Sequence, residues 1–103
     1  MGFSRAVRVG DRVLVSGIAP VWADGSCDPD PYAQALRCFA IIVEALARAG
    51  ARPDQVARTR MYLTSAEHAE VFGSAAPAAA MTVVAGLLDA RWKVEIEAEA
   101  VLD

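Results

Sequence analysis

The chain has 103 residues, of which 55% are apolar and 22% are charged, and its formal net charge is −3. This length fits one domain over residues 1–103, and the apolar share excludes a disordered tail. The negative charge argues against nucleic-acid binding, and no apolar run is long enough to span a membrane. Because 22 residues are alanine, the core buries little area per residue, and we expect oligomerisation.

The first predicted elements are two strands that form a β-hairpin. Apolar and polar residues alternate over 5–9 and again over 12–16, and Gly10-Asp11 between them is a turn signal. Residues 21–30 are rich in turn formers and predict a loop.

A helix is predicted from Pro31 to about Ala49. Asp30 can cap its first turn, proline suits the first helical position, and Gly50 is a natural stop. Apolar residues that recur at spacings of three and four predict its buried face, which would consist of Leu36, Phe39, Ile42, Val43 and Leu46.

Four further elements complete the expected order ββαβαββ. They are a strand over 56–63, a short helix over 65–72 behind a Thr64/Glu67 capping box, a strand over 80–85 and a strand over 93–101. Strands with one polar and one apolar face, beside amphipathic helices, predict an α+β fold that is a two-layer sandwich.

Few single residues could carry chemistry alone. His68 is the only histidine and has no cysteine at ligand spacing, so we expect an exposed residue and no metal site. Cys38 lies near the apolar face of the predicted helix and is expected to be buried. Cys27 has no neighbouring His or Lys to lower its pKa. Two cysteines with no disulfide or metal spacing favour a reducing, cytoplasmic setting.

The most informative pattern is a polar face shared by two predicted strands. It consists of Arg58, Arg60 and Tyr62 on one strand and Lys93, Glu95, Glu97 and Glu99 on the last. One interpretation is a solvated face with cross-strand ion pairs, each worth roughly 0.2–1 kcal/mol. The other is a face that packs against other subunits, with carboxylates in clefts where desolvation raises their pKa. The pattern favours neither.

Three segments carry a resemblance to a known family. They read SRAVRVGDRVLVSG over 4–17, VARTRMYLT over 56–64 and KVEIEA over 93–98. In this order, over nearly the whole chain, they resemble the RidA/YjgF (reactive intermediate deaminase) family. The resemblance implies a chorismate-mutase-like α+β fold, in which a mixed sheet carries two helices on one face. It also implies a homotrimer with three clefts between its subunits.

Active members of that family hydrolyse enamine and imine acids to 2-oxo acids and ammonia, without a metal or an organic cofactor. An Arg holds the substrate carboxylate, a task that suits its bidentate fork. A Glu on the last strand places the water. By this resemblance Glu95 is the catalytic, water-placing carboxylate, and Ser16 and Gly17 belong to the wall of the substrate-binding cleft.

Departures from the family pattern bear on activity. The family pattern Pro-Ala-Arg-Ser/Thr reads PAAA over 77–80, so Ala79 stands at the position of the anchoring Arg. Phe3 stands where active members usually have Tyr, and Ile18 replaces a common Gln. Loss of an Arg–carboxylate contact typically costs a few kcal/mol, roughly two to three decades in binding or rate. The chain therefore resembles the subgroup that lacks the Arg.

Three functions follow from these residues. In the first, clefts between the subunits of a homotrimer bind an unidentified small molecule, with Glu95 as a base, and standard imino-acid deaminase activity is absent. The residues expected to make the cleft apolar are Phe3, Ile18, Ala79 and Met81. In the second, the chain is a cofactor-free deaminase, a hydrolase, whose substitute anchor is Arg5, Arg12 or Arg91. In the third, the trimer is a non-catalytic interaction scaffold.

Overall fold

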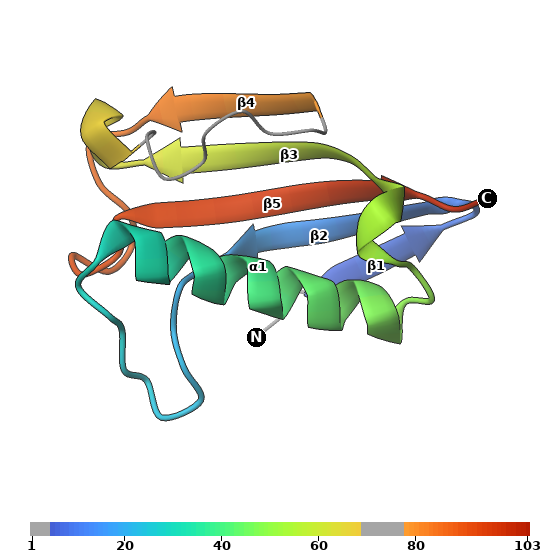
Figure 1. The fold of residues 1–103 in the computed structure, drawn as a ribbon, viewed down its shortest axis with the longest axis horizontal. Helices are drawn as coiled ribbons and strands as arrows, with labels where there is room; N and C mark the ends of the chain where they lie inside the picture. Colours follow the sequence, from blue (N-terminus) through green and yellow to red (C-terminus); the bar gives the residue numbers. More distant parts are fainter. Residues whose placement is uncertain (1–4, 69–77) are drawn as a thin grey trace.

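The fold has two layers, a five-stranded sheet and one long helix that lies across it (Figure 1). The computed structural model describes residues 5–68 and 78–103. Its elements are β1 (Ala6–Val9), β2 (Arg12–Ile18), α1 (Pro31–Arg48), the 3₁₀ turn η1 (Pro53–Gln55), β3 (Val56–Leu63), β4 (Ala78–Val83) and β5 (Val94–Val101). Within these residues no helix is long and apolar enough to cross a membrane.

The sheet is mixed, with strand order β1-β2-β5-β3-β4. β4 runs parallel to β3, and the other neighbouring strands pair antiparallel. This arrangement confirms the predicted α+β fold with a mixed sheet. α1 covers one face of the sheet, which we call the covered face, and we call the opposite side the open face.

Local sequence signals determine where the first elements begin and end. Gly10 has a φ of 61° in the turn between β1 and β2, a conformation that glycine adopts without strain. Asp30 caps α1, since its side chain accepts a hydrogen bond from the Ala33 N–H at 3.0 Å. Gly50 has a φ of 85° just beyond the last turn of α1. The predicted hairpin and helix are therefore confirmed, and β2 continues two residues beyond the predicted end, to Ile18.

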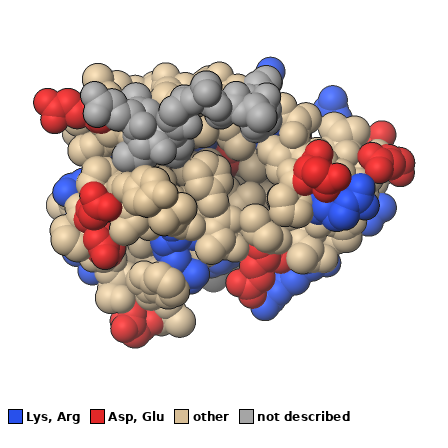
Figure 2. Space-filling model, viewed as in Figure 1, with Lys and Arg blue, Asp and Glu red and all other residues tan. Residues whose placement is uncertain are grey.

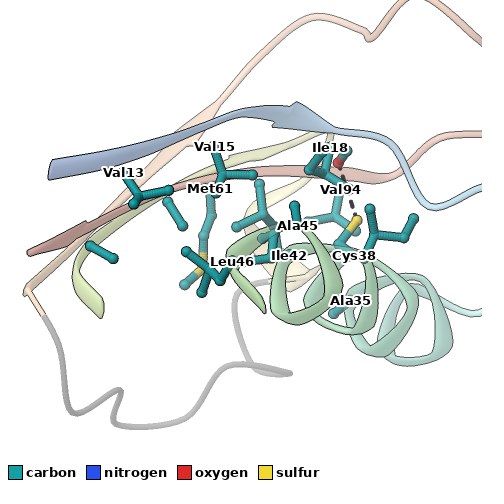
Figure 3. Packing of buried hydrophobic residues seen from close by; sticks show 14 of the residues in the cluster. Val13, Val15, Ile18, Ala35, Cys38, Ile42, Ala45, Leu46, Met61 and Val94 are labelled. Atoms are coloured by element: carbon teal, nitrogen blue, oxygen red, sulfur yellow. Dashed lines mark hydrogen bonds between the residues drawn. The ribbon is translucent and has the colours of Figure 1, made fainter. Parts of the chain in front are cut away.

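The core lies between α1 and the covered face. Figure 3 shows residues of β2, β3 and β5, among them Val15, Met61 and Val94, pointing toward α1. Cys38 is fully buried there, and its thiol donates to the carbonyl oxygen of Ile18 at 3.2 Å. The prediction that Cys38 is buried is thus confirmed.

The buried face of α1 differs from the predicted one. Ile42 and Leu46 are buried as predicted, but Leu36 is 52% exposed and Val43 is 44% exposed. The helix instead packs its smaller residues, Ala35, Cys38 and Ala45, against the sheet. Seen from this side, charged groups lie mainly at the margins of the molecule and uncharged residues cover the middle (Figure 2).

Gln34 explains the orientation of α1. It is fully buried, and its amide nitrogen donates to the carbonyl oxygens of Asp28 at 2.7 Å and Arg91 at 2.9 Å. Its amide oxygen accepts from the Lys93 N–H at 2.7 Å. A buried amide requires such partners, so Gln34 turns the side chains at positions 36 and 43 toward solvent.

Two predicted elements in the region of β4 differ from the observed ones. The strand predicted over 80–85 spans Ala78–Val83, because parallel pairing with β3 aligns Ala78 with Arg58 and Val83 with Leu63. The predicted helix over 65–72 begins as a 3₁₀ turn at 66–68, and 69–72 lie outside the described residues. Of the two helices expected on one face, the described residues therefore contain only α1.

Candidate functional site

The site begins at an irregularity in β2. The register of β2 against β5 breaks between Val15 and Ile18, so Ser16 and Gly17 form a bulge. The Ser16 N–H donates to the Arg5 carbonyl oxygen at 2.9 Å, ahead of β1. Within residues 5–68 and 78–103 no strand pairs with β2 beyond Ser16 on that side. Residues of β2, β5 and α1 line a common hollow beside this bulge.

Glu95 on β5 lies against this bulge. A Cβ atom at Gly17 would stand 2.5 Å from Glu95 Oε1, so any side chain at this position would displace the carboxylate. Burial raises the pKa of Glu95, and the negative charge of Glu97 raises that pKa further. Within the described residues Glu95 has neither a hydrogen bond nor an ion pair. Its carboxylate is therefore available to a ligand or a water.

The other two carboxylates of β5 have partners. Glu97 accepts from the Tyr62 hydroxyl at 3.0 Å and from Arg60 at 3.3 Å, and the hydrogen bond to Glu97 raises the pKa of Tyr62. Glu99 lies 3.7 Å from Arg12 in a cross-strand ion pair. Glu97 therefore has a cross-strand partner on β3 and Glu99 has one on β2, whereas Glu95 has none within the described residues.

A hollow of about 560 Å³ brings Glu95 together with Ser16, Gly17 and Ile18. We call it the Glu95 hollow. Its volume lies within the range of small-molecule sites, roughly 300–1,000 Å³. Trp22 from the loop after β2 and Trp92 from the segment before β5 also line it. The hollow thus combines aromatic walls with one carboxylate, an arrangement suited to a small organic ligand.

Two arginines line the Glu95 hollow as well, Arg5 and Arg37. Arg5 is one of the three residues that the sequence offers as a substitute anchor for a substrate carboxylate. Arg37 on α1 was missed, because a charged helical residue beside apolar ones is usually solvated. Its guanidinium instead stacks on the Trp22 ring, 4.2 Å from the centroid, and its Nε donates to the Val21 carbonyl oxygen at 2.9 Å. A tryptophan in a loop of turn formers is the one sequence signal for this contact.

The other two arginines considered from the sequence do not line the Glu95 hollow. Arg12 is engaged on the open face in its ion pair with Glu99. Arg91 is held by the Asp89 carboxylate at 2.8 Å and donates to the Gly25 carbonyl oxygen at 3.2 Å. Hydrogen bonds from Arg91 lower the pKa of Asp89 to about 2. Both guanidinium groups therefore already have acceptors.

Ala79 and Met81 lie on β4, and neither lines the Glu95 hollow. β3 separates β4 from β5, a distance of about 10 Å at roughly 4.8 Å per strand. In register, Ala79 is opposite Thr59 on the covered face, whereas Glu95 belongs to the open face. Phe3 lies outside the described residues. A single subunit therefore assembles only part of the predicted site, and these three assignments stay predictions.

A second hollow of about 390 Å³ lies on the open face, lined by Arg58, Arg60, Glu97, Glu99 and the aliphatic side chains of Val7 and Leu14. Its carboxylates are paired, as described above. We therefore place the candidate site in the Glu95 hollow, whose carboxylate has no partner within the described residues.

Neither cysteine has the lowered pKa of a reactive thiol. Burial raises the pKa of Cys27 and raises that of Cys38 to about 12, so both thiols stay protonated at neutral pH. Among the residues that the structure describes, no cluster of His, Cys, Asp and Glu could hold a metal ion.

Comparisons with known proteins agree with this fold. The family model described as endoribonuclease L-PSP matches residues 1–102. A Mycobacterium tuberculosis protein of the YjgF/YER057c/UK114 family is 36% identical, with a TM-score of 0.82 over 98% of this chain and 87% of that one. The chain belongs to the RidA/YjgF family.

Two more relatives extend the comparison. The RidA protein of the Antarctic bacterium Psychrobacter is 28% identical, with a TM-score of 0.87 over 99% of this chain and 89% of that one. A Streptomyces coelicolor protein described as uncharacterized is 38% identical over 96% of this chain and 81% of its own length. The RidA/YjgF-like fold implied by the resemblance is thereby confirmed.

Proposed function

We propose that this RidA/YjgF-family chain forms a cytoplasmic homotrimer that binds a small molecule in clefts between its subunits. We further propose that it belongs to the subgroup without the anchoring Arg and has no standard imino-acid deaminase activity. One observation carries the proposal. Glu95 lies in a hollow without a partner among the described residues, while Ala79 stands where the family pattern has the Arg.

The open face supports the trimer. Val7, Val9 and Leu14 are 48%, 61% and 42% exposed there, beside half-buried carboxylates. Apolar area on a sheet face that one subunit leaves uncovered is typical of an interaction surface. Ala79 and Met81, which one subunit holds away from Glu95, belong to the proposed site as residues of a cleft between subunits.

The contents of the Glu95 hollow support ligand binding. Its volume suits a small organic molecule, and the Gly17 bulge gives the Glu95 carboxylate room beside β2. A raised pKa suits a carboxylate to proton transfer near neutral pH. The proposal requires no metal or organic cofactor.

A second candidate is an enamine/imine deaminase whose anchor is Arg5, because Arg5 lines the same hollow as Glu95. In that reaction Glu95 takes a proton from water as the water oxygen attacks the imine carbon. Glu95 returns that proton to the nitrogen, which gives a carbinolamine. The hydroxyl group of the carbinolamine then gives its proton to the nitrogen as the C–N bond breaks, so ammonia leaves and the carbonyl group of a 2-oxo acid forms. The net change is imine acid plus water to 2-oxo acid plus ammonia.

An activity assay separates these candidates. A serine dehydratase generates 2-aminoacrylate in situ, and the release of pyruvate is followed with and without the chain. We expect no acceleration over buffer, and a gain in the A79R variant that the A79R/E95Q double variant loses. Clear acceleration by the unmodified chain, lost in R5Q, would overturn the first proposal in favour of the second. A trimer whose Glu95 hollow takes up no ligand would favour the non-catalytic scaffold.

A further inference from the structure

The Arg37 side chain is fixed before any ligand arrives. Its stacking on Trp22 and its hydrogen bond from Nε to Val21 use one face and one nitrogen of the guanidinium. Within the described residues its two terminal nitrogens donate to no acceptor. A guanidinium immobilised in this way loses little further entropy when it binds an anion.

Other groups of the Glu95 hollow point to the same kind of ligand. Among the described residues, the charged groups lining the hollow are Arg5, Arg37 and Glu95, which together carry one excess positive charge when all three are ionised. A ligand with a single negative charge balances it.

Arg37 and Arg5 differ in how they are held. Arg5 is exposed, and within the described residues its hydrogen bonds involve only its backbone oxygen, which accepts from the Ser16 N–H and hydroxyl. Arg37 is partly buried and held at two points. A preorganised cation provides the stronger and more directional contact.

We propose that Arg37 is the anion anchor of the Glu95 hollow, and that its ligand is a planar monoanion such as an aromatic carboxylate. This inference rests on the proposed function and names the class of ligand. The carboxylate lies at the α1 side of the hollow, beside Trp22, and the ring of Trp92 forms another part of the wall. Because β4 lies two strands from β5, this anchor holds a ligand differently from an Arg at position 79.

The test uses benzoate and its neutral analogue benzamide with the full chain. Binding is followed through the indole N–H signals of the two tryptophans in ¹H–¹⁵N spectra, assigned with W22F and W92F. We expect benzoate to shift both signals and benzamide to bind at least tenfold more weakly. R37Q should raise the Kd for benzoate at least tenfold, and R37K should lie between R37Q and the unmodified chain. R48Q, a change in the last turn of the same helix, should leave the Kd unchanged.

The outcomes distinguish the two proposals. If benzamide binds as tightly as benzoate, or if R37Q binds benzoate as tightly as the unmodified chain, the assignment of Arg37 is wrong and ligand binding in the hollow stands. If R5Q abolishes benzoate binding and R37Q does not, Arg5 is the anchor. If neither probe shifts either tryptophan signal, the proposed class of ligand and the assignment of Arg37 both fail, while the activity assay and light scattering still test the proposed function. Thermal unfolding of R37Q and R37K shows whether a loss of binding reflects a loss of fold.

Discussion

The two faces of the sheet differ although the same strands build both. On the covered face, Leu63 and Ile96 pack against other apolar residues and are almost fully buried. On the open face, charged side chains of β3 and β5 stand beside aliphatic residues that remain largely exposed. Most of the covered face is buried under α1, although Met81 and Val83 of β4 stay 40% and 56% exposed. On the open face, by contrast, the apolar side chains of β1 and β2 stay exposed. The comparison indicates that the stability of the fold depends mainly on the covered face, and the proposed trimer would use the open face.

The largest expected effect is a loss of stability when a cavity is made in the core beneath α1. Leu46 is fully buried, so Leu46→Ala leaves a cavity and should lower the free energy of unfolding by about 2–5 kcal/mol. Leu36→Ala on the same helix is the matched control, because Leu36 is 52% exposed, and should cost less than about 1 kcal/mol. Urea unfolding measures both. Equal losses would contradict the orientation of α1.

The next expected effect is on assembly through the open face. Leu14 is 42% exposed and lies opposite Glu99, so Leu14→Asp removes apolar area and adds a charge beside a carboxylate. We expect the circular dichroism of the fold to persist while light scattering reports a fall from the mass of three chains toward that of one. A monomeric unmodified chain would contradict the homotrimer, and a trimeric Leu14→Asp variant would exclude this face as the interface.

The smallest effect concerns Glu95 and pH. Its pKa is raised above the ordinary 4.5, so between the two values the folded chain binds more protons than the unfolded chain. Stability therefore falls as pH rises through that window. Glu95→Gln removes this loss and should slightly raise the free energy of unfolding at pH 7. The gain should fade as pH falls to about 4.5 and below.

Glu97→Gln is the matched control for this measurement. Glu97 lies two residues along the same strand but has its hydrogen bond from Tyr62 and its ion pair with Arg60. Its substitution should lower stability at pH 7, by at most about 1 kcal/mol for an exposed pair. A loss of stability in Glu95→Gln as large as that in Glu97→Gln would show that Glu95 is paired in solution.

Much of the fold could be predicted from local sequence. β3 has the predicted bounds, because the alternation of side chains over 56–63 indicates which of them face the core. The buried face of α1 could not be predicted from apolar residues alone. Gln34 is polar, yet its three hydrogen bonds turn the helix. The start of β4 depends on its partner strand, a long-range pairing that an alanine-rich sequence does not encode locally.

The site was less predictable than the fold. The family pattern led to Glu95, Ser16, Gly17 and Ile18, and the structure brings these four residues together in one hollow. It could not lead to Arg37, whose place depends on a loop folding back to set Trp22 against α1. A contact between a loop and a helix leaves no periodic pattern in the sequence, so this part of the hollow could not be predicted from the sequence alone.

Gln34 has a consequence for how a molecule could enter the hollow. One of its bonds holds the segment that follows Trp22, and two hold the segment that contains Trp92. The two aromatic walls are thus tied to a single amide and share its position. A movement that widens the entrance on one side strains the hydrogen bonds that hold the other side. We therefore expect the rate of ligand entry to depend on Gln34, in the first turn of the helix that also carries Arg37.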